Sequence, residues 1–257
     1  GIQKDLKNLE IEILKLLKNF MQLVILASGK GSRLKNKTKK IPKCLVKVNK
    51  ISIIDYNEKF INKFKKVIIV TGYKSKLIKK KLKYKNFKFV INKDFRTTNM
   101  VYSFFCASKY IYKSVIVCYS DIIFDDKIFE ILKKNYTSII VKRNWYNFWK
   151  QRMPIKKIFN DAEDLVIKKG YVKTIGGKIN KNIPKNQFMG LIKITYEDFK
   201  KLKIFFYKLN NKKIDFTNFL NLAIKHKIIK LRAFETKRFW IEIDSLKDLK
   251  LAKKKLK

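Results

Sequence analysis

Histidine is nearly absent from this 257-residue sequence, which contains a single one, His226. Catalysis by a Ser–His or Cys–His pair would have to rest on that residue, which lies in a lysine-flanked helical stretch. The three cysteines, Cys44, Cys106 and Cys118, lie in apolar surroundings without the spacing of a metal site. We therefore expect free, buried thiols, as in a reducing compartment, and chemistry without a histidine base.

Acidic residues are also scarce, with 20 against 63 lysines and arginines, which gives a net charge of +43. Such a charge is typical of proteins that bind nucleic acids. However, only six of the basic residues are arginine, the residue preferred for bidentate base contacts, and the lysines are spread along the whole chain. Ile, Asn and Lys are all heavily used, which is the pattern expected of an AT-rich coding sequence. We therefore attribute the high charge to drift in the composition of the coding sequence and expect no nucleic-acid partner.

The sequence has no apolar run near the roughly 20 residues needed to cross a bilayer, and no apolar core of a signal peptide at its start. We expect no membrane association and a cytoplasmic location. The hydrophobic content of 46%, with 14% aromatic residues, predicts a folded globular protein.

From residue 22 onward, β-branched apolar runs alternate with segments of helical spacing. The pattern predicts strands at 22–27, 66–71, 87–91, 114–119, 136–142, 188–194 and 240–243, and helices at 52–64, 75–82, 98–110, 196–208 and 215–226. Apolar strands separated by helices predict a mostly parallel sheet covered on both faces. A β-hairpin is expected at 165–175, within an insertion at about 143–188 of one domain over 21–257.

Residues 2–20 have the spacing of an amphipathic helix that precedes this domain. It is expected to be an appendage of the domain, and it could mediate a homodimer or pack on its own domain.

A glycine-rich loop follows the first strand and contains Gly29, Gly31 and Arg33. Glycines after a parallel strand let the backbone approach phosphates closely, and an arginine fork suits phosphate oxygens. The spacing fits neither a Walker loop nor a complete Rossmann fingerprint, because Leu34 stands where the third glycine would be. On spacing alone, a plain turn between strand and helix explains the loop equally well. Lys43, fixed after Pro42, could neutralise a triphosphate.

Carboxylates stand at two predicted strand ends. Asp121 follows the strand at 114–119. Glu242 lies near the end of the last strand, and Asp244 follows it. Ligands of open α/β sheets gather at the carboxyl ends of strands, and carboxylates there suit Mg²⁺. The alternative for Asp121 is that it caps the next helix.

Longer segments carry a resemblance to a known family. They are Leu26-Ala27-Ser28-Gly29-x-Gly31-Ser32-Arg33-Leu34, Pro42-Lys43-x-Leu45, Thr98-Asn99-Met100-Val101-Tyr102-Ser103, Tyr119-Ser120-Asp121-Ile122 and Glu242-Ile243-Asp244-Ser245. The first two resemble the signature of the nucleotidyltransferases that include sugar-1-phosphate pyrophosphorylases, with Ser28 in place of the family's usual second alanine. The others resemble phosphocholine, phosphonate and phosphoglutamine cytidylyltransferases. The similarity covers about residues 21–257.

The resemblance implies a nucleotide-binding, Rossmann-like three-layer α/β fold and a role for each matching residue. The implied nucleotide contacts are Leu26, Ala27, Ser28, Gly29, Gly31, Ser32, Arg33, Lys43, Asn99 and Ser103. The implied Mg²⁺ ligands are Asp121 and Asp244, with Glu242 as a third acid. Arg33, Lys43 and Asp121 would carry the catalysis, a transfer of CMP from CTP to a small phosphorylated or phosphonate acceptor. An acceptor already ionised at neutral pH needs no general base.

The acceptor is left open by the sequence. Further resembling segments contain Trp145, Tyr146, Trp149, Arg152, Asp161 and Glu163. The aromatic rings could form a cage for the quaternary ammonium of choline, or could pack against the sheet. Asp161 and Glu163 could instead bind the primary amine of aminoethylphosphonate or of an amino-acid amide phosphate. Two rival functions remain at this stage: uridylyl or thymidylyl transfer to a sugar phosphate, and non-enzymatic binding of nucleic acid.

Overall fold

The computed structural model describes residues 21–83, 85–179 and 183–256. The predicted helix at 2–20 lies outside the described residues. The strands are β1 (Met21–Ala27), β2 (Lys47–Val48), β3 (Ile51–Ser52), β4 (Val67–Thr71), β5 (Lys88–Ile91), β6 (Ser114–Tyr119), β7 (Ile122–Phe124), β8 (Ser138–Arg143), β9 (Glu163–Lys168), β10 (Tyr171–Lys178), β11 (Asn186–Ile194), β12 (Arg232–Thr236) and β13 (Trp240–Glu242).

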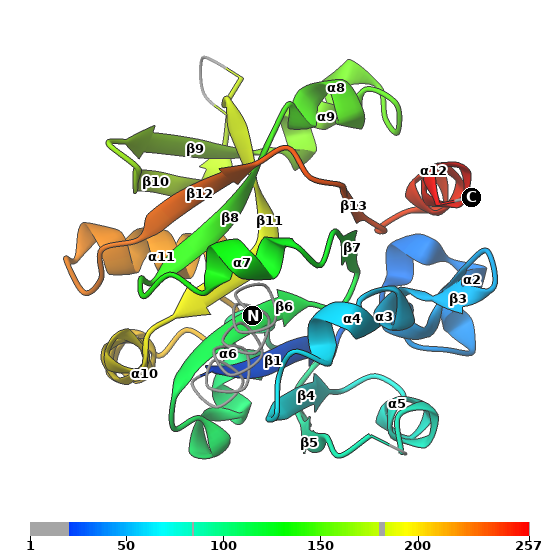
Figure 1. Ribbon diagram of the computed structural model, residues 1–257, viewed down its shortest axis with the longest axis horizontal. Coiled ribbons are helices and arrows are strands. Elements are labelled where there is room, and N and C mark those ends of the chain that lie inside the picture. The colour runs from blue at the N-terminus through cyan, green and yellow to red at the C-terminus, as the bar shows by residue number, and fades with distance from the viewer. Residues whose placement is uncertain (1–20, 84, 180–182, 257) are drawn as a thin grey trace, which may run out of the picture.

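The main sheet has nine strands in the order β5-β4-β1-β6-β11-β8-β12-β10-β9. The first four strands of this order pair in parallel. β11 runs antiparallel to both of its neighbours, β12 pairs in parallel with β8, and β10 reverses direction again. Since β9 is antiparallel to β10, only β11 and β10 oppose the common direction of this sheet. The predicted mostly parallel mixed sheet is therefore confirmed, and the β9–β10 hairpin forms one of its edges (Figure 1).

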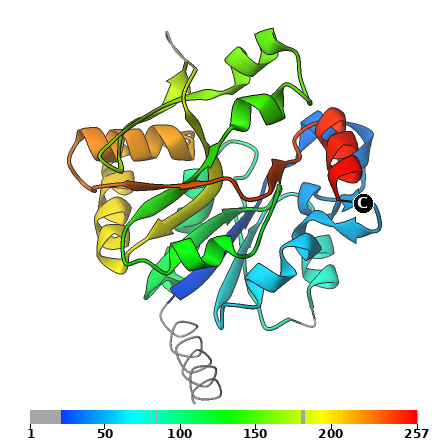
Figure 2. The ribbon, with the colours of Figure 1, turned by 45° about the horizontal axis from the view of Figure 1, so that its top comes forward.

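Helices cover both faces of the sheet (Figure 2). They are α2 (Asn36–Lys39), α3 (Ile53–Tyr56), α4 (Glu58–Ile61), α5 (Ser75–Lys81), α6 (Met100–Cys106), α7 (Ile128–Leu132), α8 (Trp145–Trp149), α9 (Ile155–Asp161), α10 (Tyr196–Leu209), α11 (Phe216–Lys225) and α12 (Leu246–Lys255). Short 3-10 turns are η1 (Ser32–Leu34), η2 (Lys43–Leu45) and η3 (Ser108–Tyr110). None of the helices in the described part of the chain is long and apolar enough to span a bilayer.

The alternation of side chains along β1 explains the three layers. Leu23 and Ile25 point to one face, where they join a cluster that includes residues of α4, α5 and α7. Val24 and Leu26 point to the other face and join residues of α6, α10 and α11. All four are buried, so β1 is a central strand covered on both faces and reads as a continuous apolar run.

A small two-stranded sheet closes the end of the molecule where β1 and β6 terminate. β7 follows β6 almost directly and pairs antiparallel with β13, with Glu242 opposite Ile122. Beneath this pair lies a third apolar cluster, which includes Leu34, Ile123 and Ile243. α12 follows β13 and lies beside the segment that carries α2 and β3 (Figure 1). This pairing brings the segments around residues 121 and 244 together.

Some element boundaries differ from the sequence prediction. The single helix expected at 52–64 is interrupted at Asn57, whose side-chain amide donates to the carbonyl of Ile122 at 2.7 Å. The helix expected from Thr98 begins at Met100, because the side chain of Asn99 caps it by accepting from the backbone N–H of Met100. β12 was not predicted, since its sequence mixes charged and apolar residues without a continuous apolar run.

Candidate active site

The glycine-rich loop leaves β1 and turns back at Gly31, which has φ +64°. The carbonyl of Gly31 accepts hydrogen bonds from the Thr38 hydroxyl at 2.8 Å and from the backbone N–H of Leu34 at 3.1 Å. A Cβ at position 31 would lie 2.9 Å from the Cβ of Lys43, whereas one at Gly29 would meet nothing within 4 Å. Gly31 is therefore required both by its backbone conformation and by the close approach of Lys43.

A matched pair of alanine substitutions tests this requirement. Gly31→Ala should lower the free energy of unfolding by about 1–3 kcal/mol, because alanine is strained at positive φ and its methyl displaces Lys43. Gly29→Ala should change it by less than about 1 kcal/mol, because a methyl there meets open space. Urea unfolding of both variants measures the difference. Equal costs would contradict the close contact between Gly31 and Lys43.

Three carboxylates and one ammonium group meet beside this loop. Oxygen atoms of Asp121, Glu242 and Asp244 all lie within 4.8 Å of one another. The Nζ of Lys43 donates to Asp121 Oδ2 at 2.7 Å and also bonds Asp244 Oδ1. The backbone pairing of β7 with β13 sets this arrangement, and the N–H of Ile243 donates to the carbonyl of Asp121 at 2.9 Å. The two carboxylate segments predicted at separate strand ends are thus neighbours.

The charges of this cluster depend on one another. Burial raises the pKa of Glu242 well above its ordinary value, and the nearby carboxylates of Asp244 and Asp121 raise it further. Burial alone would also raise the pKa of Asp244, but Lys43 and Arg33 outweigh it and the pKa is lowered. For Lys43, burial favours the neutral amine, yet the surrounding carboxylates raise the pKa above its usual value. Lys43 and Arg33 therefore favour the ionised form of Asp244, whereas burial among carboxylates favours the protonated form of Glu242.

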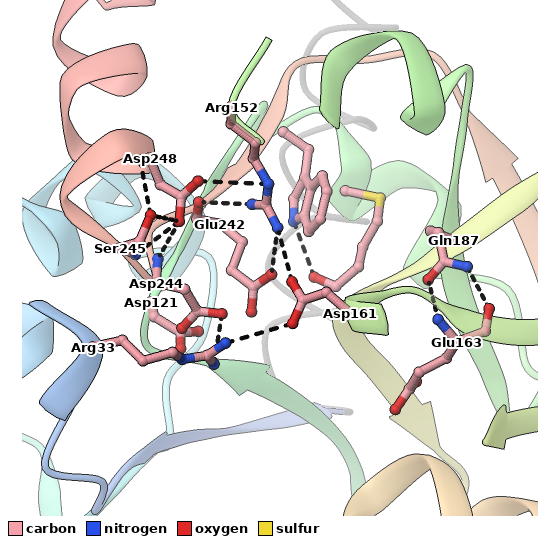
Figure 3. Close-up of polar contacts among 12 residues, drawn as sticks. Arg33, Asp121, Arg152, Asp161, Glu163, Gln187, Glu242, Asp244, Ser245 and Asp248 are labelled. Carbon is pink, nitrogen blue, oxygen red and sulfur yellow. Dashed lines mark hydrogen bonds and ion pairs between the residues drawn. The ribbon is translucent and has the colours of Figure 1, made fainter. Parts of the chain in front are cut away.

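Two arginines join this cluster to α9 and α12 (Figure 3). Arg33 lies 2.8 Å from Asp244 and 3.6 Å from Asp161, and its side chain is 63% exposed. Arg152 has a side chain that is 0% exposed and lies 3.5–3.8 Å from Asp161, Glu242 and Asp248. Arg33 is accordingly accessible to a ligand, whereas Arg152 is buried beside three acids, of which only Asp248 is itself buried.

The glycine-rich loop and the acidic cluster form the walls of a cavity of about 360 Å³. It is lined by Leu26, Ser28, Gly29, Gly31, Ser32, Arg33, Lys43, Phe95, Thr98, Asn99, Met100, Ser103, Tyr119, Ser120, Asp121, Glu242 and Asp244. Every residue expected to contact a nucleotide is present except Ala27, whose side chain packs in the core. Asn99 caps α6 and Ser103 accepts from the amide of Asn92 at 2.9 Å, so both are held in position.

A second cavity, of about 200 Å³, adjoins the first. It is lined by Arg33, Met100, Tyr119, Ile122, Trp149, Asp161, Glu163, Gln187, Phe188, Met189, Gly190, Asp215, Phe216, Thr217, Trp240, Glu242 and Asp244. The two cavities share Arg33, Met100, Tyr119, Glu242 and Asp244. A ligand in each would therefore meet at the acidic cluster.

Two of the residues expected to bind the acceptor do not line this second cavity. Trp145 is 1% exposed and its indole N–H donates to the carbonyl of Pro184 at 2.7 Å, so its ring belongs to the core. Arg152 is enclosed by Asp161, Glu242 and Asp248 and covers the ring of Trp149 at 4.2 Å. Of the two alternatives that the sequence left open for Trp145, Tyr146 and Trp149, packing of the rings is favoured, because Trp145 and Tyr146 do not line the cavity. Trp149, Asp161 and Glu163 do line the cavity.

Sequence reasoning missed several residues of the site. Asp248 accepts from the backbone N–H groups of Asp244 and Ser245 at 3.1 and 2.7 Å, which fixes the loop that carries Asp244. The Ser245-x-x-Asp248 spacing is that of a capping box, and this signal could have revealed the role of Asp248. Asp215 and Thr217 line the second cavity from the start of α11, and no local pattern marks them as site residues.

Known proteins resemble this chain along most of its length. The family model described as Nucleotidyl transferase matches residues 22–138. A protein of Campylobacter jejuni named CTP:phosphoglutamine cytidylyltransferase is 32% identical over 252 residues, covering 90% of this chain and 98% of the relative. The solved inositol-1-phosphate CTP transferase of T. maritima has a TM-score of 0.74 at 19% identity, covering 91% of this chain and 95% of that chain. The solved Streptococcus pneumoniae CTP:phosphocholine cytidylyltransferase has a TM-score of 0.73 at 19% identity, covering 93% of this chain and 100% of that chain. The two structures show a shared fold.

Proposed function

Since this chain belongs to the nucleotidyl transferase family, we propose that it transfers CMP from CTP to a small phosphorylated or phosphonate acceptor and releases pyrophosphate. The observation that carries the proposal is the meeting of Lys43, Asp121 and Asp244 in the first cavity, where Asp244 also lines the second. One cavity has the size and the backbone loop for a nucleotide, and the smaller one adjoins it. The 32%-identical relative, named for CTP and phosphoglutamine, favours cytidine as the base.

Lys43 and Arg33 are the groups placed to hold the triphosphate. Arg33 projects from the loop with most of its side chain exposed, so its guanidinium can leave Asp161 for phosphate oxygens. Lys43 lies deeper, where an ammonium group neutralises charge that builds up on phosphate oxygens during transfer. Asn99, the N-cap of α6, and Ser103, within α6, are the candidates for contacts with the base.

The acidic cluster fits a divalent cation, for which we propose Mg²⁺. Asp121, Glu242 and Asp244 offer carboxylate oxygens, the ligands that Mg²⁺ prefers. Asp121 Oδ1 is buried and has no hydrogen-bond partner among the described residues, so it is available as a ligand. When bound, the ion would neutralise the triphosphate and polarise the α-phosphoryl group.

The reaction then needs no general base from the protein. An ionised phosphate or phosphonate oxygen of the acceptor attacks the α-phosphorus of CTP, the bond to the β-phosphate oxygen breaks, and pyrophosphate leaves with the electron pair. The protein contributes positioning and charge: the shared wall of the two cavities aligns the attacking oxygen, and Lys43 and Arg33 hold the leaving pyrophosphate. This mechanism agrees with a sequence that has one histidine, outside the residues that line either cavity.

Nucleotide preference is the most direct test. In 5 mM MgCl₂, CTP should raise the melting temperature more than UTP, dTTP or GTP, with a stabilisation of about 2.7 kcal/mol when its concentration is a hundred times Kd. A larger shift with UTP or dTTP would favour the rival transfer to sugar phosphates. No shift with any nucleotide, together with a salt-sensitive RNA complex, would overturn the proposal.

A further inference from the structure

Two carboxylates in the second cavity have no basic partner among the described residues. Glu163 and Asp215 both line it, and no lysine or arginine within the described ranges forms an ion pair with either. This is unexpected in a chain with 63 basic and only 20 acidic residues, where most of the described acids are paired. Bringing two unpaired carboxylates together in a half-buried site is unfavourable unless a cation joins them.

The two carboxylates are held in place rather than left mobile. The hydroxyl of Thr217 lies 2.8 Å from Glu163 Oε1 and 3.0 Å from Asp215 Oδ1, and it has one proton to donate between them. Gln187 accepts from the backbone N–H of Glu163 at 3.4 Å and donates to its carbonyl at 2.5 Å (Figure 3). Asp215 caps α11 by accepting from the N–H of Asn218 at 2.8 Å. Such fixed acceptors suit a ligand with several N–H donors.

Trp149, one of several aromatic residues that line the cavity, does not offer an open ring face to a quaternary ammonium. Arg152 already covers the ring of Trp149 at 4.2 Å, and Trp145 packs edge-on against Trp149 inside the core. A trimethylammonium group has no N–H donor and relies on open aromatic faces. A primary ammonium has three N–H donors for carboxylates.

We propose that the acceptor carries a primary ammonium group, which Glu163 and Asp215 bind while the acceptor's phosphate or phosphonate lies at the acidic cluster. This inference rests on the proposed function. The volume of about 200 Å³ restricts the acceptor to a small molecule, and the wall shared with the nucleotide cavity receives its anionic end. Acceptors of this class are 2-aminoethyl phosphates and phosphonates and the amide phosphates of amino acids.

Acceptors that differ only in methylation of the nitrogen test the proposal. Pyrophosphate release from CTP is measured with phosphoethanolamine and with glutamine amide phosphate, and with the N-trimethylated counterpart of each. At least one primary amine should give a kcat/KM about tenfold or more above its trimethylated counterpart, because methylation removes the N–H donors. Turnover of neither primary amine, or equal use of the methylated forms, would overturn the inference.

Isosteric variants assign the effect to the two carboxylates. Asp215→Asn retains the helix cap and Glu163→Gln retains an acceptor for Thr217, so both should fold. Each should raise KM for the preferred primary amine by about tenfold or more, with KM for CTP unchanged. Asp164→Asn, next in the chain but absent from the cavity wall, is the control and should leave both constants unchanged. Unchanged KM values for the amine in both site variants would also overturn the inference.

Binding of CTP separates this failure from failure of the proposed function. If CTP raises the melting temperature and supports turnover of trimethylated acceptors, the proposed transferase function stands and the proposal of a primary-ammonium acceptor is wrong. If CTP neither binds nor reacts, the proposed function itself fails.

Discussion

Asp121→Asn should lower the rate of pyrophosphate release from CTP at saturating substrate by at least about a thousandfold. The side chain contacts Lys43 at 2.7 Å, and its other oxygen is buried without a hydrogen-bond partner among the described residues. Asparagine has the same shape but lacks the charge that holds the ammonium group and that a divalent cation requires. Loss of this carboxylate therefore removes charge where the triphosphate reacts.

The fold should survive this change, because the hydrogen bond that joins β7 to β13 at this point uses the backbone carbonyl of Asp121. Far-ultraviolet circular dichroism and urea unfolding check that point. Asp126→Asn is the matched control: Asp126 pairs with Lys63 at 2.8 Å and lines neither cavity, so its rate should match that of the unaltered protein. A near-normal rate for Asp121→Asn would exclude the proposed site.

The central part of the fold could be predicted from the sequence because its signals are local. β1, β4 and β6 are continuous apolar runs, and the predicted ranges agree with the structure to within a residue. Asp121 follows the parallel strand β6 and so emerges at the carboxyl edge of the main sheet, whereas Asp244 follows β13 and reaches Asp121 through the antiparallel pairing of β13 with β7. β12 and the break at Asn57 could not be predicted, because both depend on hydrogen bonds to distant strands.

On the acceptor side of the site, too, some features could be predicted from the sequence and others depend on contacts between distant segments. Trp145 and Trp149 look alike in the sequence and both pack in the core, yet only Trp149 also lines a cavity. Asp215 comes to Glu163 only because α11 packs against β10, a contact between segments about 50 residues apart along the chain. Residue type and spacing predict which chemistry is available, whereas the partners that neutralise each charge depend on tertiary packing.

Removal of the Lys43 ammonium group should have the second large effect. Lys43→Met keeps the length of the side chain but leaves Asp121, Glu242 and Asp244 without the cation between them. Breaking a buried ion pair from one side typically costs about 3–5 kcal/mol, so the free energy of unfolding at pH 7.5 should fall by an amount of this order. Turnover of CTP should fall by about a hundredfold or more, because the leaving pyrophosphate loses a charged donor.

The same variant offers a test of the cation site that does not depend on activity. With the ammonium group gone, a divalent cation no longer competes with Lys43 for these carboxylates, so MgCl₂ should raise the melting temperature of Lys43→Met more than that of the unaltered protein. EDTA should reverse the shift. Lys47→Met, at an exposed position on β2, is the control and should respond to MgCl₂ as the unaltered protein does. Equal shifts in all three proteins would mean that these carboxylates do not bind the cation. A larger shift in Lys43→Met would mean that ammonium and metal neutralise the same three acids in turn, so that Lys43 is released to the triphosphate as the metal binds.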